Sequence, residues 1–79
     1  MTKPELLDHL ARVRDADAHE VAEIFDLPYP AAAMALLRLT RQGLVARRLD
    51  PGTGMYWYTL TEQGERRLAY FRSLEDAAS

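Results

Sequence analysis

The sequence contains no cysteine and only two histidines, four glycines and four prolines among 79 residues. Without cysteine, neither a disulfide framework nor a zinc site built on thiolates is possible. No apolar run approaches the roughly 20 residues of a membrane-spanning helix, and the N-terminal stretch is unlike a signal peptide. These absences favour a cytoplasmic protein with no membrane partner.

The chain also lacks the patterns that usually carry catalysis. His9 and His19 lie ten residues apart on different predicted helices, without a spaced Asp/His cluster, so no metal site is expected. No glycine-rich phosphate loop precedes a predicted helix. The acidic residues around position 17 are explained as helix caps and as partners of the helix dipole. We therefore expect neither an enzyme nor a bound cofactor.

The apolar content is sufficient for a core, because 48% of the residues are hydrophobic. The length predicts one domain, residues 1–79. A chain this short buries only about 60% of the surface that its unfolded form exposes, which makes a dimer plausible.

Charge is distributed unevenly along the chain, although its net value is only −2. Residues 1–26 hold three basic and seven acidic side chains, whereas residues 27–61 hold four arginines and one aspartate. The net charge argues against a general nucleic-acid binder, whereas the positive charge in the middle of the chain, next to the predicted hairpin, is an electrostatic hint of an anionic partner.

Helical periodicity covers the first half of the sequence. Thr2 and Glu5 form a capping box in front of an apolar stripe, which predicts a helix over residues 3–13. A second helix is expected over about 18–25. A proline-containing turn separates it from a third helix, which ends at Gly43, a residue type typical of the left-handed position after a helix.

The period then changes to that of extended chain. Residues 44–49 and 55–60 are predicted strands, and the Pro-Gly-rich segment between them is a turn by composition. Thr61 is a suitable N-cap for a last helix over residues 62–74, and the tail beyond it is expected to fray. Tyr58 and Leu60 share the strand face that is expected to pack inward.

The element order predicts an α+β fold, mostly α, of the winged helix-turn-helix type. It comprises three helices, a two-stranded β-wing and a C-terminal helix. The helix-turn-helix would span about 18–42, the wing about 44–60 and the C-terminal helix about 62–74.

Two patterns resemble bacterial winged-helix regulators. Residues 36–45 read L-x-x-L-x-x-x-G-L-V, similar to the end of their recognition helix. Residues 58–68 read Y-x-L-T-x-x-G-x-x-x-L, similar to the segment after the wing in the PadR and MarR groups. The resemblance implies a dimeric bacterial or archaeal transcription regulator that binds double-stranded DNA, with its third helix in the major groove and its wing on the backbone. Each signature position also has a core or turn role, so function follows only by analogy.

The third helix departs from the family pattern. Where the family usually carries polar residues that read bases, this chain has Ala31, Met34 and Ala35, and only Arg38 and Arg41 could reach guanine or phosphate. Two interpretations remain open. The helix docks shallowly on DNA, or its apolar face, extended by Leu37, binds a protein partner.

Candidate contacts of the wing also have two explanations. Arg47 and Arg48 would contact phosphate. Alternatively, they belong to a solvated strand edge, or Arg47 stacks on Trp57 as a cation–π pair. Thr53 at the wing tip and Tyr29 before the third helix are further candidates, although turn chemistry and the flanking prolines could account for them. The predicted DNA-binding residues are Tyr29, Ala31, Met34, Ala35, Arg38, Arg41, Arg47, Arg48 and Thr53.

The last helix offers an apolar stripe of Leu68, Phe71 and Leu74. Part of this stripe must cover the core, and the remainder is the candidate dimerisation surface. A two-fold dimer would present two recognition helices about one DNA turn apart.

Overall fold

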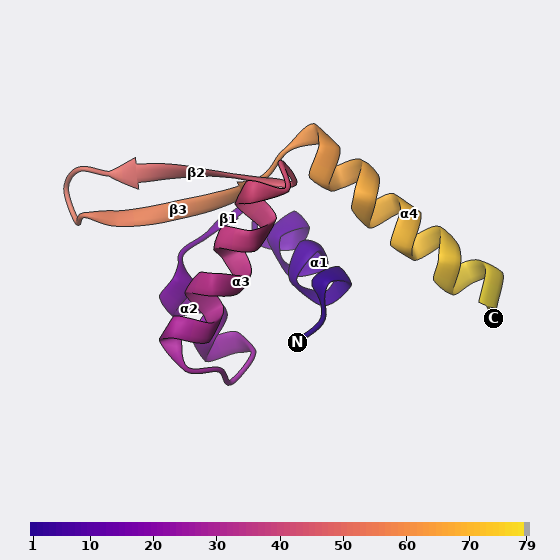
Figure 1. The fold of residues 1–79 in the computed structure, drawn as a ribbon, viewed down its shortest axis with the longest axis horizontal. Coiled ribbons are helices and arrows are strands. Elements are labelled where there is room, and N and C mark those ends of the chain that lie inside the picture. Colours follow the sequence, from indigo (N-terminus) through magenta and orange to yellow (C-terminus); the bar gives the residue numbers. More distant parts are fainter. Residues whose placement is uncertain (79) are drawn as a thin grey trace.

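The structure is a computed structural model that describes residues 1–78, with the side chains of residues 1–77. Its elements are α1 (Lys3–Val13), β1 (Asp15–Ala16), α2 (Ala18–Ile24), α3 (Tyr29–Arg41), β2 (Val45–Asp50), β3 (Met55–Leu60) and α4 (Glu62–Ala78) (Figure 1). The predicted winged helix-turn-helix is confirmed, with α2 and α3 as the helix-turn-helix and β2–β3 as the wing.

The sheet is antiparallel, with strand order β1-β3-β2. It has three strands in the described chain: β2 and β3 form the predicted two-stranded wing, and the short β1 is an additional strand that the sequence analysis does not predict. Asp15 and Ala16 pair with Thr59 and Tyr58 at the base of the hairpin. The Thr59 hydroxyl also donates to the Arg14 carbonyl at 2.9 Å. A two-residue strand has no periodicity of its own, which is why sequence reasoning assigned it to a break between helices.

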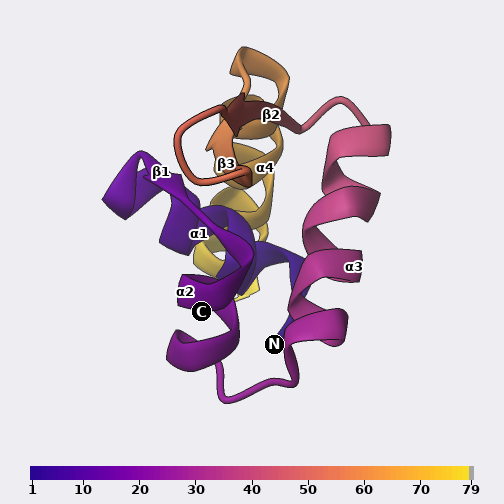
Figure 2. The same cartoon turned by 90° about the vertical axis from the view of Figure 1, so that its left-hand side faces the viewer.

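The elements form an elongated body of about 44 × 26 × 20 Å. The wing extends to one side above α2 and α3, and α4 runs away on the other side beside α1 (Figure 1). Figure 2 shows α2 and α3 joined by their turn below the sheet. The long hairpin and the long last helix therefore leave the body in opposite directions.

The core lies where α1, α2 and α3 meet the inner face of the sheet. α1 contributes three leucines, α3 contributes Leu36 and Leu39, and the sheet contributes Val45 and Tyr58. Leu68 of α4 closes the core, with only 4% of its surface exposed. The inward face predicted for Tyr58 is therefore confirmed.

Side-chain caps begin three of the helices, as the sequence predicts. The Thr2 Oγ accepts the Glu5 N–H at 3.3 Å, and the Thr2 hydroxyl donates to the Glu5 carboxylate at 3.1 Å. Asp17 accepts the Glu20 N–H at 2.8 Å. Thr61 accepts the Gly64 N–H at 3.0 Å. Each cap satisfies an N–H that has no partner within its helix.

α3 starts directly after the predicted proline-containing turn, whereas the end of α4 differs from the prediction. α3 begins at Tyr29, with Pro30 inside its first turn, where the missing N–H has no helical partner. α4 continues to Ala78, so the segment after residue 74 that was expected to fray is helical. Neither glycine nor proline interrupts this segment, which explains why the helix continues past its apolar stripe.

The junction between α3, β2 and α4 is closely packed. Gly43 has a φ of +76°, which releases the chain from α3. The Thr61 hydroxyl donates to the Gly43 carbonyl at 2.7 Å, and the Thr61 N–H donates to the Leu44 carbonyl at 3.1 Å. Gly64 packs its Cα against the Leu44 carbonyl, where a Cβ would overlap the oxygen. The glycine is therefore required by contact between two backbone segments.

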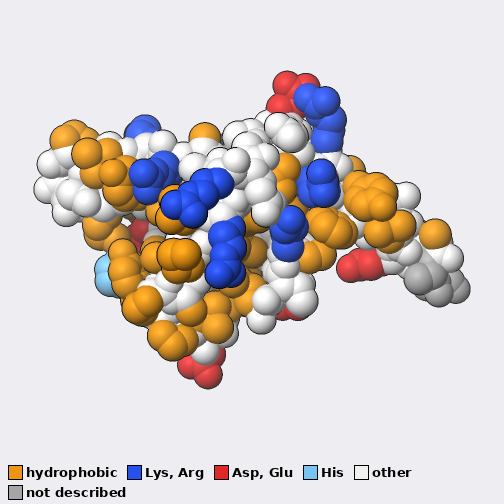
Figure 3. Space-filling view, in the orientation of Figure 1, with side chains coloured by type: hydrophobic (Ala, Val, Ile, Leu, Met, Phe, Trp, Pro, Cys, Tyr) orange, Lys and Arg blue, Asp and Glu red, His pale blue; other side chains and the backbone are white. Residues whose placement is uncertain are grey.

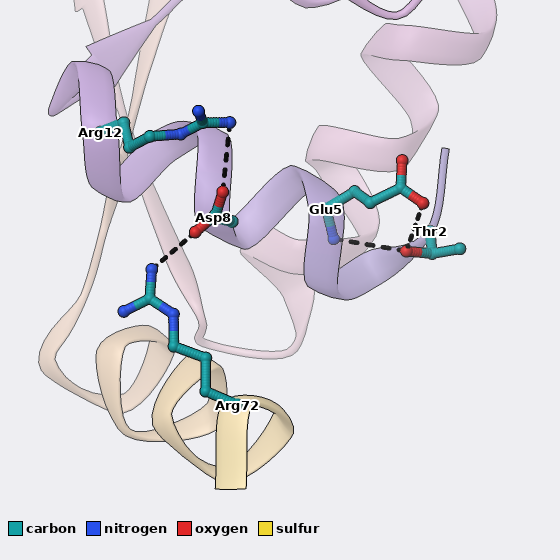
Figure 4. Close-up of polar contacts among 5 residues, drawn as sticks. All are labelled: Thr2, Glu5, Asp8, Arg12 and Arg72. Atoms are coloured by element: carbon teal, nitrogen blue, oxygen red, sulfur yellow. Dashed lines mark hydrogen bonds and ion pairs between the residues drawn. The ribbon is translucent and has the colours of Figure 1, made fainter. Parts of the chain in front are cut away.

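Asp8 connects α1 with α4 (Figure 4). Its carboxylate accepts from Arg72 at 2.6 Å and lies 3.2 Å from Arg12 of the next turn. The hydrogen bond from Arg72, followed by the charge of Arg12, lowers the pKa of Asp8 below its ordinary 3.8. The pair holds the middle of α4 against α1.

We predict that Gly64→Ala destabilises the protein by about 1–3 kcal/mol, because the new methyl group overlaps the Leu44 carbonyl and forces the backbone apart. In an open helix the same change would stabilise by about 1 kcal/mol. Chemical denaturation followed by circular dichroism measures the difference. Arg67→Ala, an exposed change in the same helix, is the control and should have little effect. An increase in stability for Gly64→Ala would contradict the contact.

We predict that Asp8→Asn lowers the free energy of unfolding by less than about 1 kcal/mol at pH 7, since Asp8 and Arg72 are both partly exposed. The folded pKa of Asp8 is lowered, so its contribution is complete above the ordinary value of 3.8 and disappears as the pH falls through the folded value. Urea denaturation at pH 7 and pH 3 should show the two proteins converging. A difference that persists unchanged at pH 3 would contradict the ion pair.

Candidate nucleic-acid interface

The solvent-facing side of α3 is a single stripe of residues three or four apart. Its members are Ala31, Met34, Arg38 and Arg41, all exposed. The opposite side, with Ala32, Leu36 and Leu39, is buried against the core. Ala35 borders the stripe and is half-buried. The buried side fixes the rotation of the helix, so these positions face outward as the sequence predicts.

The stripe changes character halfway along α3. Its N-terminal half has no side chain that can form a hydrogen bond, and 44% of the Met34 surface is exposed. Its C-terminal half carries Arg38 and Arg41, and no ion pair is recorded for either within the described residues. No acidic residue lies in the sequence between Asp26 and Asp50. The two guanidinium groups are therefore available to an anionic partner.

The two arginines of β2 lie on opposite faces of the sheet. Arg47 is paired with Tyr58 on the inner face, and Arg48 is paired with Trp57 on the outer face. The Arg47 guanidinium lies 4.3 Å from the centre of the Tyr56 ring. The cation–π partner suggested from the sequence, Trp57, is therefore wrong, because residues next to each other in a strand alternate between faces. Both arginine residues are exposed.

The wing turn is organised by Asp50. Its carboxylate accepts the Gly52 N–H at 2.9 Å and the Trp57 indole N–H at 3.4 Å. These hydrogen bonds, that from Gly52 first, lower the pKa of Asp50. The Thr53 hydroxyl accepts the Met55 N–H at 3.3 Å, so this exposed candidate already has a local role in the turn.

Tyr29 lies at the start of α3 with its ring against His19 of α2, with 4.4 Å between ring centres. It is 48% exposed and faces a hollow that Tyr56 of the wing also lines. Tyr29 is therefore an exposed residue at the start of α3.

Lys3 is a further cation that sequence reasoning missed. Its Nζ donates to Gln42 Oε1 at 2.8 Å, and it lines a hollow beside Arg38 at the C-terminal half of α3. Lys3 and Gln42 are separated by 39 positions, so no local pattern connects them. The fold therefore adds a positive charge from α1 to the surface of α3.

Figure 3 shows several Lys and Arg side chains on one face of the molecule. Lys and Arg side chains gather across the middle of the view, from the wing over α3, and the acidic side chains visible there lie at the margins. Apolar side chains occupy the lower part of the same face, over α2 and the start of α3. The face thus combines a basic band with an apolar area.

The candidate dimerisation residues of α4 differ in accessibility. Leu68 packs in the core of its own chain, Phe71 is half-buried and Leu74 is 48% exposed. Tyr70 beside them is 56% exposed. A hollow between α1 and α4 is lined by Phe71 and Leu68 together with polar residues of α1. The outer part of the stripe is therefore the accessible part.

The described residues contain neither a metal-binding cluster nor a membrane-spanning helix. No group of three or more His, Cys, Asp or Glu side chains is placed to hold a metal ion there. None of the described helices is long and apolar enough to cross a membrane.

Comparison with known proteins relates this chain to transcription regulators. It is 44% identical over 64 residues to the HTH-type transcriptional repressor NsrR of Streptomyces coelicolor. The aligned region covers 76% of this chain and 41% of that protein. No protein-family model matches the chain.

Solved structures share its fold. The YusO protein of Bacillus subtilis superposes with a TM-score of 0.90 at 19% identity, over 96% of this chain and 55% of that one. A variant of Staphylococcus aureus MepR bound to an oligodeoxyribonucleotide superposes with a TM-score of 0.86 at 22% identity, over 96% of this chain and 57% of that one. MarR of E. coli superposes with a TM-score of 0.83 at 19% identity, over 91% of this chain and 54% of that one. The resemblance to MarR-type winged helices is confirmed, and the chain spans about half the length of these proteins.

We predict that Asp50→Ala loosens the wing without unfolding the helices, because both the Gly52 N–H and the indole of Trp57 lose their acceptor. Trp57 is the only tryptophan in the sequence, so its fluorescence reports on the wing alone. Its emission should shift to longer wavelength and its quenching by iodide should increase, with the helical circular dichroism unchanged. Asp50→Asn keeps one acceptor oxygen, so its iodide quenching should lie between that of the unchanged protein and that of Asp50→Ala. Unchanged quenching in Asp50→Ala would contradict this role.

Proposed function

We propose that this MarR-like winged helix binds double-stranded DNA and regulates transcription, with α3 in the major groove and the wing on the phosphate backbone. The observation that carries the proposal is the set of exposed arginines without acidic partners on α3 and β2. By analogy with bacterial relatives, we infer that it works in the cytoplasm. No catalytic role is proposed.

The charge distribution favours a polyanion over a small acidic ligand. Arg38 and Arg41 follow the axis of α3, and Arg47 and Arg48 extend the positive charge along the wing. Lys3 adds a cation beside Arg38. An elongated set of separate cations suits successive phosphates, each of which contributes to binding by release of counterions.

The comparisons support the same proposal. The relative from Streptomyces coelicolor is named a transcriptional repressor, and the MepR structure contains an oligodeoxyribonucleotide. These statements belong to those proteins. For this chain, they make DNA binding by the same fold the first hypothesis to test.

We propose a homodimer that is joined through the accessible part of α4. Phe71, Leu74 and Tyr70 present an apolar surface beyond the core. A second copy that covers this surface would repeat the same contacts about a two-fold axis and place two α3 helices on one side of the assembly. Sedimentation of Leu74→Asp beside the unchanged protein tests this arrangement.

The alternative is a protein-interaction module. The exposed Met34 and Ala31, with Ala35 and Leu37 half-buried beside them, form an apolar surface that could pack on another chain. In that case the arginines would surround the interface and contribute little to affinity.

We predict that a labelled mixed-sequence duplex binds at low salt and that log K falls with log salt by about 0.9 per phosphate contacted. Arg41→Ala and Arg48→Ala should each weaken binding and reduce this slope by about one contact. Fluorescence anisotropy across a salt series measures both. Arg66→Ala is the matched control, since it removes the same charge from an arginine that is paired with Glu62 on α4.

Absence of binding at low salt by the folded protein would overturn the DNA-binding proposal. The interaction module would then be tested with Met34→Asp, which should abolish capture of a partner chain, whereas Arg38→Ala should not. Equal losses from Arg66→Ala and Arg41→Ala would show that only net charge matters, and would contradict the interface described.

A further inference from the structure

The division of the α3 stripe into an apolar and a basic half has a specific consequence for the DNA sequence that it can read. We propose that the N-terminal half of α3 reads the methyl groups of thymine through Ala31 and Met34, and that Arg38 reads an adjacent guanine. This inference rests on the proposed function and specifies the base sequence that it requires.

The chemistry of the major groove determines which bases such a surface can select. Each base edge presents hydrogen-bond donors and acceptors, and only thymine adds an apolar group, the C5 methyl. Ala31 and Met34 are exposed and carry no donor or strong acceptor. These two side chains therefore cannot select adenine, cytosine or guanine through hydrogen bonds, whereas a thymine methyl group can be buried against them. The flexible thioether chain of Met34 can follow the position of that methyl.

The polar side chains of α3 do not replace this readout in its N-terminal half. The Tyr29 ring lies against His19 at the edge of the surface. The Thr40 hydroxyl donates to the Leu36 carbonyl at 2.9 Å and is half-buried. The remaining polar groups, Arg38 and Arg41, lie in the C-terminal half. Because the N-terminal part of a recognition helix meets base edges, apolar contact governs the reading there.

The helix also sets the spacing of the bases. Ala31 and Arg38 are seven residues apart on one side of α3, a rise of about 10.5 Å. Successive base pairs are about 3.4 Å apart, so this rise covers about three base pairs. Arg38 has no recorded acidic partner, so its fork is free to donate to O6 and N7 of guanine. The expected half-site has one or two thymines about three base pairs from a guanine.

The experiment begins with selection of binding sites from random duplexes by the full chain. In the best site, each thymine is then replaced singly by deoxyuridine, which removes only the methyl group. Loss of one buried methyl should weaken binding about fourfold. Replacement of thymines outside the half-site is the internal control and should change nothing.

Protein variants assign the contact. Met34→Ala should reduce the preference for thymine over uracil, and Met34→Leu, which keeps an apolar side chain of similar size, should retain it. Arg38→Ala should relax selection at the guanine and leave the thymine preference intact. Circular dichroism checks that each variant is folded.

The outcomes separate this inference from the proposed function. Salt-dependent binding with a fourfold loss at specific thymines, reduced in Met34→Ala, supports both. Salt-dependent binding with no difference between thymine and uracil at any position overturns the methyl readout and leaves DNA binding intact. Absence of binding to every duplex at low salt overturns the proposed function, and the inference with it.

Discussion

The contact between Thr61 and the chain that leaves α3 is the constraint on which the arrangement depends. One threonine donates its hydroxyl to the Gly43 carbonyl, accepts the Gly64 N–H with the same oxygen, and donates its backbone N–H to Leu44. The end of α3, the start of β2 and the start of α4 therefore meet at one residue. Because Gly64 allows α4 to approach the Leu44 carbonyl, the three elements have fixed relative directions.

Electrostatic separation follows from this geometry. Acidic side chains in and beside α1 and α2 serve as a helix cap, as with Asp17, and as an ion-pair partner, as with Asp8. The arginines of α3 and β2 have no such partners among the described residues. A protein with a small negative net charge thus presents a basic band on one face (Figure 3). The local charge of this face, and not the net charge of the chain, determines which partner it can bind.

The sequence predicted the helices, the hairpin and the caps because these depend on neighbouring residues. Thr2, Asp17 and Thr61 each accept an N–H three residues ahead, a spacing that can be read directly. The stripe of α3 was predictable for the same reason. The third strand, the pairing of Lys3 with Gln42 and the packing of Arg47 on Tyr56 were not predictable. They depend on strand register and on residues distant in sequence, which local periodicity does not report.

The straight course of α4 away from the body has a consequence for the whole assembly. In a dimer joined through the outer part of α4, each α4 acts as a strut whose inner end is fixed to α3 at Thr61. The angle between the two struts then sets the distance between the two α3 helices. Any change at the dimer interface would alter the distance between the two α3 helices. The helices would then no longer fit a pair of half-sites with fixed spacing. The length and stiffness of one helix would thus determine the spacing of the DNA sequence and offer a mechanical route to release it.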